Sequence, residues 1–137
     1  MLFFLFIAVR NEKKVIKRCI EQIFAQDTTE DFELFVIDGM STDGTFELLT
    51  ELKNSFNFTL LKNKKINAAA GRNLGIKKAK GKYIAFIDGD AIPAKDWLRQ
   101  IKKVFDAHDE SVAGVGGPDL LPKDSTKKEE CIGLVMT

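Results

Sequence analysis

The chain has 137 residues, a length that suits one compact domain. Hydrophobic residues make up 45% and charged residues 30%, a composition typical of a folded soluble protein and not of a disordered segment. The formal net charge is +1, so nothing in the overall charge indicates a nucleic-acid partner. Lysines gather at positions 62–65 and 77–82, and we interpret both runs as solvated surface.

The first segment, MLFFLFIAV, is apolar along its whole length and predicts a strand that is buried on both faces. It lacks the basic start and the small-residue cleavage site of a signal peptide. It is also too short to cross a bilayer as a helix. We therefore expect a cytoplasmic chain without a membrane anchor of its own.

Strands and helices are predicted to alternate along the chain. The predicted strands are Leu2–Val9, Phe32–Ile37, Phe56–Leu61, Tyr83–Ile87 and Val112–Val115. Four helices are predicted between and after these strands. The first carries the apolar repeat from Val15 to Phe24, and the second begins at Asp43-Gly44-Thr45. The third runs from Asn67 to Lys80 and ends at Gly81, and the fourth follows Pro93. This alternation indicates an α/β fold in one domain over residues 1–137: a mostly parallel sheet with right-handed crossovers and helices on both faces.

Charged side chains follow three of the predicted strands at the point where each strand ends. They are Arg10 and Glu12, then Asp38 and Asp43, and then Asp88 and Asp90. In parallel sheets, ligands bind outside the carboxyl ends of the strands, where the strand order reverses. The sequence therefore predicts a ligand site at this edge of the sheet.

Asp88 and Asp90 stand two residues apart, so in an extended segment their carboxylates face the same side. Gly89 between them lets a ligand approach the backbone. Two carboxylates without a neighbouring His or Cys favour a hard cation, Mg²⁺ or Mn²⁺, whose remaining ligands substrate phosphates can supply. The structural alternative is that Asp88 is a turn residue and Asp90 a helix cap ahead of Pro93.

Asp38 and Arg72 are two further candidates for binding a nucleotide. Asp38 can accept a hydrogen bond from a nucleobase N–H, whereas Ser41, Asp43 and Gly44 are expected to cap the following helix. Arg72 lies among small residues and can pair with a phosphate or lie against a base. Its structural alternative is a surface salt bridge.

Several other kinds of site are disfavoured. Cys19 and Cys131 have no metal spacing, and Cys19 falls on an apolar helix stripe that predicts a core position. His108 lies in a polar stretch and is interpreted as a surface residue. There is no GxGxxG after a strand and no GxxxxGK[ST], and Ile92 and Pro93 occupy positions where a calcium loop needs Asp or Asn and Gly.

Taken together, these motifs resemble a family 2 glycosyltransferase of the GT-A (Rossmann-like) fold. The resemblance rests on ArgAsnGlu after the first strand, on VIDGMSTDGT, on AGRNLGIKKAKGKYIAFIDGDAIP and on AVGGPDLLP, in this order. It covers nearly the whole chain. It implies the nucleotide-sugar-binding half of such an enzyme, truncated after the fifth strand.

The resemblance also implies roles for individual residues. Ala8, Arg10 and Glu12 match the loop that lies against the nucleoside, and Asp38 matches the aspartate that recognises the base, commonly uracil. Arg72 matches a basic residue of the nucleotide pocket. Asp88, Gly89 and Asp90 match the DxD motif, whose first aspartate lies near the ribose and whose second holds the metal, Mn²⁺ or Mg²⁺, on the diphosphate.

The sequence departs from the family pattern in two places. Gly39 replaces the second aspartate of the commoner VDDGS form, so a contact at Gly39 falls to the backbone. Family members carry the catalytic base beyond the fifth strand, and the chain stops at Thr137 in an expected helix, 129–136. No catalytic residue is assigned, since no spacing supports Asp119 or Asp124.

The resemblance implies inverting transfer of a sugar from a nucleotide diphosphate donor, with UDP-sugar favoured, to an acceptor hydroxyl on a glycan or a lipid-linked substrate. One alternative is a non-catalytic nucleotide-sugar-binding module. Another is a haloacid-dehalogenase-like phosphatase with Asp88 as its nucleophile. The sequence leaves open whether a membrane-associated partner holds the chain at the cytoplasmic face.

Overall fold

The computed structural model describes residues 2–108 and 112–117. Contacts within the chain divide it into two units, residues 1–97 and residues 98–137. The first unit contains the sheet and the helices that cover it. Of the second unit, the structure describes most of α4 (Trp97–Ala107) and the segment 112–117.

The first unit is built on a four-stranded parallel sheet in the order β3-β2-β1-β4. Its strands are β1 (Phe3–Val9), β2 (Phe32–Asp38), β3 (Thr59–Lys62) and β4 (Tyr83–Asp88). The central strand β1 has hydrogen-bonded neighbours on both sides, which explains why its sequence, FFLFIAV, is apolar at every position.

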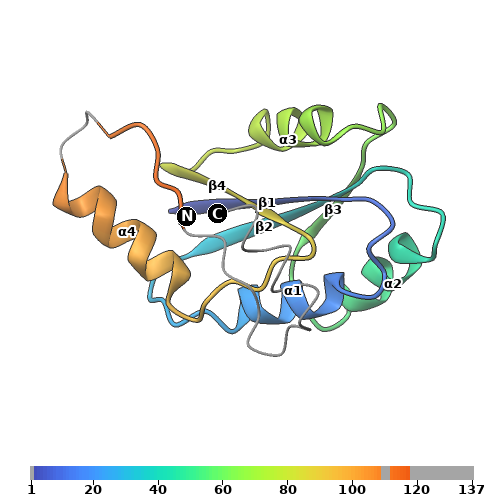
Figure 1. Ribbon diagram of the computed structural model, residues 1–137, viewed down its shortest axis with the longest axis horizontal. Helices are drawn as coiled ribbons and strands as arrows, with labels where there is room; N and C mark the ends of the chain where they lie inside the picture. The colour runs from blue at the N-terminus through green and yellow to red at the C-terminus, as the bar shows by residue number, and fades with distance from the viewer. Residues whose placement is uncertain (1, 109–111, 118–137) are drawn as a thin grey trace, which may run out of the picture. The chain divides into compact units, whose positions relative to one another are not determined.

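Three helices connect the strands and cover both faces of the sheet (Figure 1). They are α1 (Ile16–Phe24), α2 (Thr45–Leu52) and α3 (Ala68–Ile76). The helices α1 and α2 lie on one face and α3 lies on the other. The chain moves outward from β1 through β2 to β3 and then returns past β1 to β4. The strand order therefore reverses between β1 and β4.

The core beneath α3 is aromatic. Phe4, Phe6, Phe35 and Ile37 are buried together, and the Phe6 and Phe35 ring centroids lie 5.1 Å apart. Gly75 of α3 lies directly over the Phe6 ring, because a Cβ built at Gly75 would come within 2.3 Å of Phe6 Cδ1. The glycine thus lets α3 approach the sheet closely, and the approach brings the start of α3 over the carboxyl end of β1.

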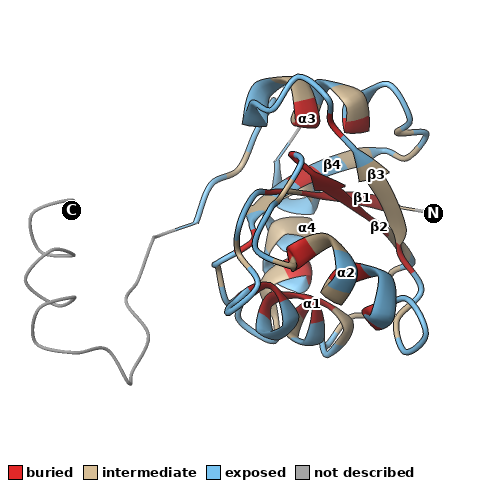
Figure 2. Cartoon of the chain, turned by 90° about the vertical axis from the view of Figure 1, so that its right-hand side faces the viewer, coloured by how far each residue is buried: buried red, intermediate tan, exposed pale blue. Residues whose placement is uncertain are grey.

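The core on the opposite face is aliphatic. Helix α1 buries four members of the predicted apolar repeat, Ile16, Cys19, Ile20 and Ile23, whereas Val15 is 39% exposed. Helix α2 adds Leu49 and Leu52. Figure 2 shows the buried residues concentrated in the central strands and on the helix sides that face them. Cys19 is 1% exposed, so its predicted core position is confirmed.

The alternating α/β pattern and the parallel sheet are confirmed, and the predicted start of the third strand and end of the third helix were wrong. The third strand begins at Thr59 and not at Phe56, because the Phe56 ring packs against the Phe24 ring, 5.1 Å away between centroids. The third helix ends at Ile76 and not at Lys80. Tight backbone bonds from Lys78 to Gly75 (2.8 Å) and from Ala79 to Ile76 (3.1 Å) turn the chain toward β4.

The predicted fifth strand, Val112–Val115, was also wrong. Residues 112–117 form no regular secondary structure and carry glycine at three of their six positions. Glycine weakens a strand because it has no side chain to pack and loses more backbone entropy on ordering. Cys131, Asp119, Asp124 and the expected helix 129–136 lie outside the described residues.

His108 is exposed, and its Nδ1 lies 2.8 Å from the Val104 carbonyl oxygen. Within residues 2–108 and 112–117, no helix combines the length and the apolar character needed to cross a membrane.

Candidate functional site

The carboxyl ends of β1, β2 and β4 meet at one edge of the sheet, at the point where the strand order reverses. The strand register places Ile37, Ala8 and Asp88 in one row across the sheet, with Val9 and Asp38 one residue beyond it. Loops from this row lead into α1, α2 and the 89–96 segment. This is the place in an open parallel sheet where a ligand is expected to bind.

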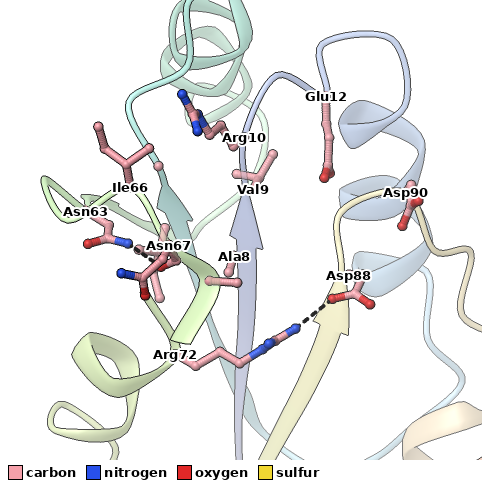
Figure 3. Close-up of a pocket in the computed structure, with 13 residues that line it drawn as sticks. Ala8, Val9, Arg10, Glu12, Asn63, Ile66, Asn67, Arg72, Asp88 and Asp90 are labelled. Carbon is pink, nitrogen blue, oxygen red and sulfur yellow. Dashed lines mark hydrogen bonds and ion pairs between the residues drawn. The ribbon is translucent and has the colours of Figure 1, made fainter. Parts of the chain in front are cut away.

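A cavity of about 300 Å³ opens above this row (Figure 3). Its lining contains seven of the residues that the sequence had singled out: Ala8, Arg10, Glu12, Gly39, Arg72, Asp88 and Asp90. Asp38 and Gly89 lie buried beside it. The structure therefore brings all nine predicted residues to one place. It adds the neighbours Val9, Ile37, Asn63, Ile66, Asn67 and Ala68, which the prediction missed.

The loops after β1 and β2 are tied together by reciprocal hydrogen bonds. Asn11 N donates to Ser41 Oγ (2.9 Å), and Thr42 N donates to Asn11 Oδ1 (2.8 Å). Glu12 N donates to Thr45 Oγ1 at 3.0 Å. These contacts span about thirty residues of sequence and fix one loop against the other, so the two loops form one rigid side of the cavity.

The expected cap of α2 is partly confirmed. Asp43 Oδ1 accepts hydrogen bonds from the backbone N–H and the hydroxyl of Thr45, and its Oδ2 accepts from Lys13 N at 3.2 Å. The Thr45 hydroxyl is the main cause that lowers the pKa of Asp43. Gly44 takes a left-handed conformation (φ 91°) at the cap position. Ser41 does not cap the helix, because its hydroxyl accepts from Asn11 instead.

Asp38 is a buried carboxylate, only 1% exposed, at the end of β2. Its Oδ2 accepts a hydrogen bond from Ser41 N (3.1 Å), while its Oδ1 has no partner among the described residues. A buried, unpartnered carboxylate oxygen costs stability unless a ligand satisfies it. Asp38 is therefore built to accept one more hydrogen bond.

The loop after β3 forms the other wall of this part of the cavity, which the sequence analysis did not predict. Asn63 is 6% exposed, and its Nδ2 donates to the Asn67 carbonyl oxygen at 2.7 Å. Ile66 has φ 58°, which is costly for a β-branched residue. Asn67 caps α3 as predicted, accepting from Ala70 N at 2.7 Å. The signal for Asn63 was its position directly after a strand.

Glu12 hangs from the β1–α1 loop toward the turn that follows β4 (Figure 3). Its Oε2 has no hydrogen-bond partner in the described chain, and a Cβ at Gly89 would come within 2.1 Å of that atom. Burial, and then the charges of Asp90, Asp88 and Asp43, raise the pKa of Glu12 to about 7. Gly89 is therefore the residue that lets the Glu12 carboxylate lie against this turn.

Asp88 and Asp90 project from the end of β4. Asp88 Oδ1 forms an ion pair with Arg72 Nη2 at 3.0 Å, and 69% of the Asp88 side chain is exposed. Asp90 is exposed and makes no side-chain bond within the described residues. The Cys19 thiol donates to the Asp88 carbonyl oxygen at 3.6 Å, and burial raises the pKa of that thiol to about 12. The thiol therefore stays protonated near neutral pH and serves as a structural hydrogen-bond donor.

These carboxylates fit a divalent cation only with help from a ligand. Among the described residues, no group of three or more His, Cys, Asp or Glu side chains could hold a metal ion alone. Asp88 and Asp90 supply two hard oxygen donors, and Glu12 adds a buried carboxylate oxygen that has no partner among the described residues. One or two carboxylates are the usual protein share of a magnesium or manganese site completed by phosphate oxygens.

Comparison with known proteins identifies the family. The pattern of glycosyl transferase family 2 matches residues 4–126, and the chain belongs to that family. The fold of S. aureus TarS residues 1–349 superposes with a TM-score of 0.72 at 25% identity, covering 87% of this chain and 39% of that one. The parallel sheet with helices on both faces is therefore of the GT-A type.

Two further similarities bear on the site. A protein of Methanococcus voltae is 34% identical over 114 residues, 78% of this chain and 36% of its own; it is named dolichyl N-acetyl-alpha-D-glucosaminyl phosphate 3-beta-D-2,3-diacetamido-2,3-dideoxy-beta-D-glucuronosyltransferase. The mannosyltransferase PcManGT of Pyrobaculum calidifontis, solved with GDP-Man and Mn²⁺, gives a TM-score of 0.69 at 27% identity over 74% of this chain and 31% of that one. The chain thus spans about a third of the length of these proteins.

Proposed function

We propose that this chain is the donor-binding part of a glycosyltransferase and holds a nucleotide diphosphate sugar, with UDP-sugar favoured, in the cavity above β1 and β4. The observation that carries the proposal is the layout of the cavity. A buried acceptor, Asp38, lies at one end, and the exposed acids Asp88 and Asp90 lie at the other. A nucleotide diphosphate has the matching layout, with a base at one end and a charged diphosphate at the other.

The Asp38 end is proposed to hold the nucleoside. The free Oδ1 of Asp38 accepts an N–H of the base edge, and Ala8, Gly39 and Ile66 leave room for a flat ring between the β2 and β3 loops. Arg10, from the same rim, lies against the nucleoside. TarS has been solved with UDP and with UDP-GlcNAc, and PcManGT with GDP-Man, which supports a nucleotide sugar without settling which base this chain takes.

The Asp88 end is proposed to hold the diphosphate and a divalent cation, Mn²⁺ or Mg²⁺. Asp88 and Asp90 would bind the ion, which supplies positive charge to stabilise a leaving diphosphate. Gly89 leaves the backbone open to the ligand, and Arg72 exchanges its ion pair with Asp88 for a phosphate oxygen. The Glu12 carboxylate lies against the same turn, beside Gly89. The Mn²⁺ in the PcManGT complex supports a metal at this end.

The reaction proposed for the whole protein is a direct displacement with inversion. An acceptor hydroxyl forms a bond to the sugar C1 as the bond from C1 to the diphosphate breaks, and the nucleoside diphosphate leaves with the electron pair. The proton of the hydroxyl must go to a base, and the described residues supply none that we assign. Two relatives, the dolichyl phosphate transferase of Methanococcus voltae and a diphosphoundecaprenol glucosyltransferase of Escherichia coli, are named for lipid-linked acceptors, which favours such an acceptor here.

The second candidate is a nucleotide-sugar-binding module without transfer. It requires only the binding layout of the cavity, since the described residues supply no base that we assign. Membership of the glycosyltransferase family argues against the phosphatase alternative. A phosphatase of that kind would also require Asp88 to act as a nucleophile, whereas its carboxylate is paired with Arg72.

The test is a calorimetric titration of UDP into the chain with Mn²⁺ and with a chelator, alongside Asp90→Ala. We expect binding that requires the cation and that weakens by about a hundredfold in the variant. The absence of binding by folded protein in all conditions would refute the proposal. Release of free sugar or its transfer to an acceptor then separates the enzyme from the binding module.

A further inference from the structure

A second charged surface lies at the opposite end of the sheet from the cavity. It comprises the end of α3 and the turn into β4: Ile76, Lys77, Lys78, Lys80, Lys82 and Ile84, here called the basic turn. Figure 1 shows this connection at the amino end of β4, whereas the loop from β3 into α3 lies at the carboxyl end. Since α3 has nine residues, roughly 13 Å of helix separates the two regions.

The four lysines of the basic turn are exposed, and none of them forms an ion pair within the described residues. Lys82 Nζ lies 5.2 Å from the Tyr83 ring centroid, a contact that leaves its charge uncompensated. Backbone bonds from Lys77 to Asn73 (3.3 Å) and from Lys78 to Gly75 (2.8 Å) order the turn. The positive charges are therefore held together on a defined surface rather than spread over a loose loop.

The same region contains a shallow cavity of about 380 Å³, separate from the candidate site. Lys77, Lys78 and Lys80 surround it, the rings of Phe4 and Phe35 line it from the core, and Glu33 is its one carboxylate. Phe4 and Phe35 are 4% and 5% exposed. An anion at this cavity would meet three positive charges and one negative charge.

Apolar side chains border the lysines. Ile76 and Ile84 are each 42% exposed, although both belong to regular elements. Ile84 pairs with Phe4 in the β1–β4 register and so lies beside the cavity on the α3 face of the sheet. The basic turn thus presents positive charge and exposed aliphatic side chains on one surface, a combination that suits the boundary between lipid headgroups and acyl chains.

We infer that the basic turn docks this chain on the anionic surface of a lipid bilayer. The lysines face lipid phosphates and carboxylates, and the two isoleucines enter the headgroup region. Nucleic acid fits less well, because the exposed side chains of Ile76 and Ile84 would be left against a polar backbone. The inference does not depend on what the cavity above β1 binds.

The experiment is cosedimentation of the whole chain with phosphatidylcholine vesicles and with vesicles that contain about 30% phosphatidylglycerol. The test variant carries Lys77→Glu, Lys78→Glu and Lys80→Glu. The control variant carries Lys14→Glu, Lys53→Glu and Lys95→Glu, which makes the same change in net charge at exposed lysines elsewhere on the first unit. Circular dichroism melting establishes that each variant is folded, and a second test variant with glutamine at the three positions serves if the reversal is unstable.

We expect binding to the anionic vesicles only, weakening with added salt and falling roughly tenfold or more in the test variant but much less in the control. Ile76→Ser should lower binding without changing the melting temperature. Equal losses in the two reversal variants, equal binding to neutral vesicles, or no vesicle binding would overturn the inference, as would capture of a nucleic-acid duplex in preference to vesicles. UDP binding should be the same in all variants, so a failure of the donor-site proposal is seen separately.

Discussion

The two sides of the candidate site are held in different ways. On the side of Asp38, the loops after β1 and β2 are joined by four hydrogen bonds between a backbone N–H and a side chain of the other loop. On the side of Asp88, the chain after β4 is tied to the rest of the unit by the Cys19 thiol and by an exposed ion pair with Arg72, and further along by hydrogen bonds from Gln26 and Asp27 to the Ala94 and Lys95 carbonyl oxygens. Glu12 belongs to both sides, with its backbone tied and its carboxylate oxygen unpartnered.

Each side is therefore suited to bind a different part of a ligand. The Asp38 side, whose two loops are hydrogen-bonded to each other, keeps its shape before a ligand arrives and so suits recognition of a flat group of fixed shape. On the Asp88 side, here called the acidic side, the carboxylates of Glu12, Asp88 and Asp90 repel one another and lower the stability of the unliganded chain. Arg72 is their one cationic partner among the described residues. A ligand that supplies positive charge would remove that repulsion and stabilise the fold. The predictions below test these two descriptions, from the largest expected effect on stability to the smallest.

Removing the Thr45 hydroxyl should weaken the contact between the two loops on the Asp38 side. Thr45 is fully buried, and its hydroxyl accepts from Glu12 N at 3.0 Å and donates to Asp43. Thr45→Val keeps the side-chain shape but leaves the Glu12 N–H without that partner, so we expect a loss of about 1–3 kcal/mol in the free energy of unfolding. Urea unfolding followed by circular dichroism measures it.

The control for this variant is Thr50→Val on the same helix. The exposed Thr50 hydroxyl donates to the Phe46 carbonyl oxygen at 2.9 Å, and its loss should change stability by less than about 0.5 kcal/mol. Equal effects in the two variants would mean that the hydrogen bonds between the loops stabilise the fold no more than a bond within one helix. The Asp38 side would then be no more rigid than the acidic side.

Neutralising Glu12 should reveal the strain on the acidic side through its pH dependence. The folded pKa of Glu12 is about 7, above its ordinary 4.5, so folding favours the protonated form. The contribution of protonated Glu12 to the free energy of unfolding is complete below pH 4.5 and is lost as the pH rises to about 7. With a chelator present, Glu12→Gln should melt near wild type at about pH 4, gain stability between the two values, and keep a constant gain above them.

The control is Glu51→Gln, which replaces an exposed carboxylate on α2. Its melting temperature should follow that of the wild type in parallel across the whole range. A Glu12→Gln variant that also runs parallel to the wild type would contradict the claim that this carboxylate is strained. Added Mn²⁺ and UDP should narrow the Glu12→Gln gain if the ligand neutralises the acidic side.

The sequence was sufficient for the framework because the framework depends on local patterns. Continuous apolar runs marked β1, β2 and β4, and polar residues at the strand ends marked nine residues that the fold brings together. Asn67 was correctly predicted as a cap, since an asparagine before a run of alanines has few other roles. These signals require only the spacing of residues along the chain.

The errors came where contacts between distant segments decide the outcome. Asn63 stands among lysines and was interpreted as part of a solvated loop, yet its amide is buried against Asn67. Phe56 was assigned to a strand, yet its ring packs on Phe24, which is remote in sequence. The left-handed backbone of Ile66 has no sequence signal at all, because the residue type argues against it. Burial and strain of this kind are set by the tertiary fold.

Arg72 gives the smallest expected effect on stability and separates structure from function most cleanly. Its ion pair with Asp88 joins side chains that are 41% and 69% exposed, and such pairs contribute less than about 1 kcal/mol. Arg72→Gln should therefore barely change the melting temperature. If Arg72 moves to a phosphate when the nucleotide binds, the same variant should weaken UDP affinity by about tenfold, the range of one charge-assisted hydrogen bond.

The matched control is Lys17→Gln, which removes another exposed ion pair, with Glu21 at 3.8 Å on α1, away from the cavity. It should leave both the melting temperature and the UDP affinity unchanged. An Arg72→Gln variant with wild-type affinity would mean that Arg72 only pairs with Asp88 at the surface, and the acidic side would then have to bind the diphosphate through a cation alone. The two outcomes thus decide whether the acidic side contributes a positive charge of its own or depends entirely on a cation.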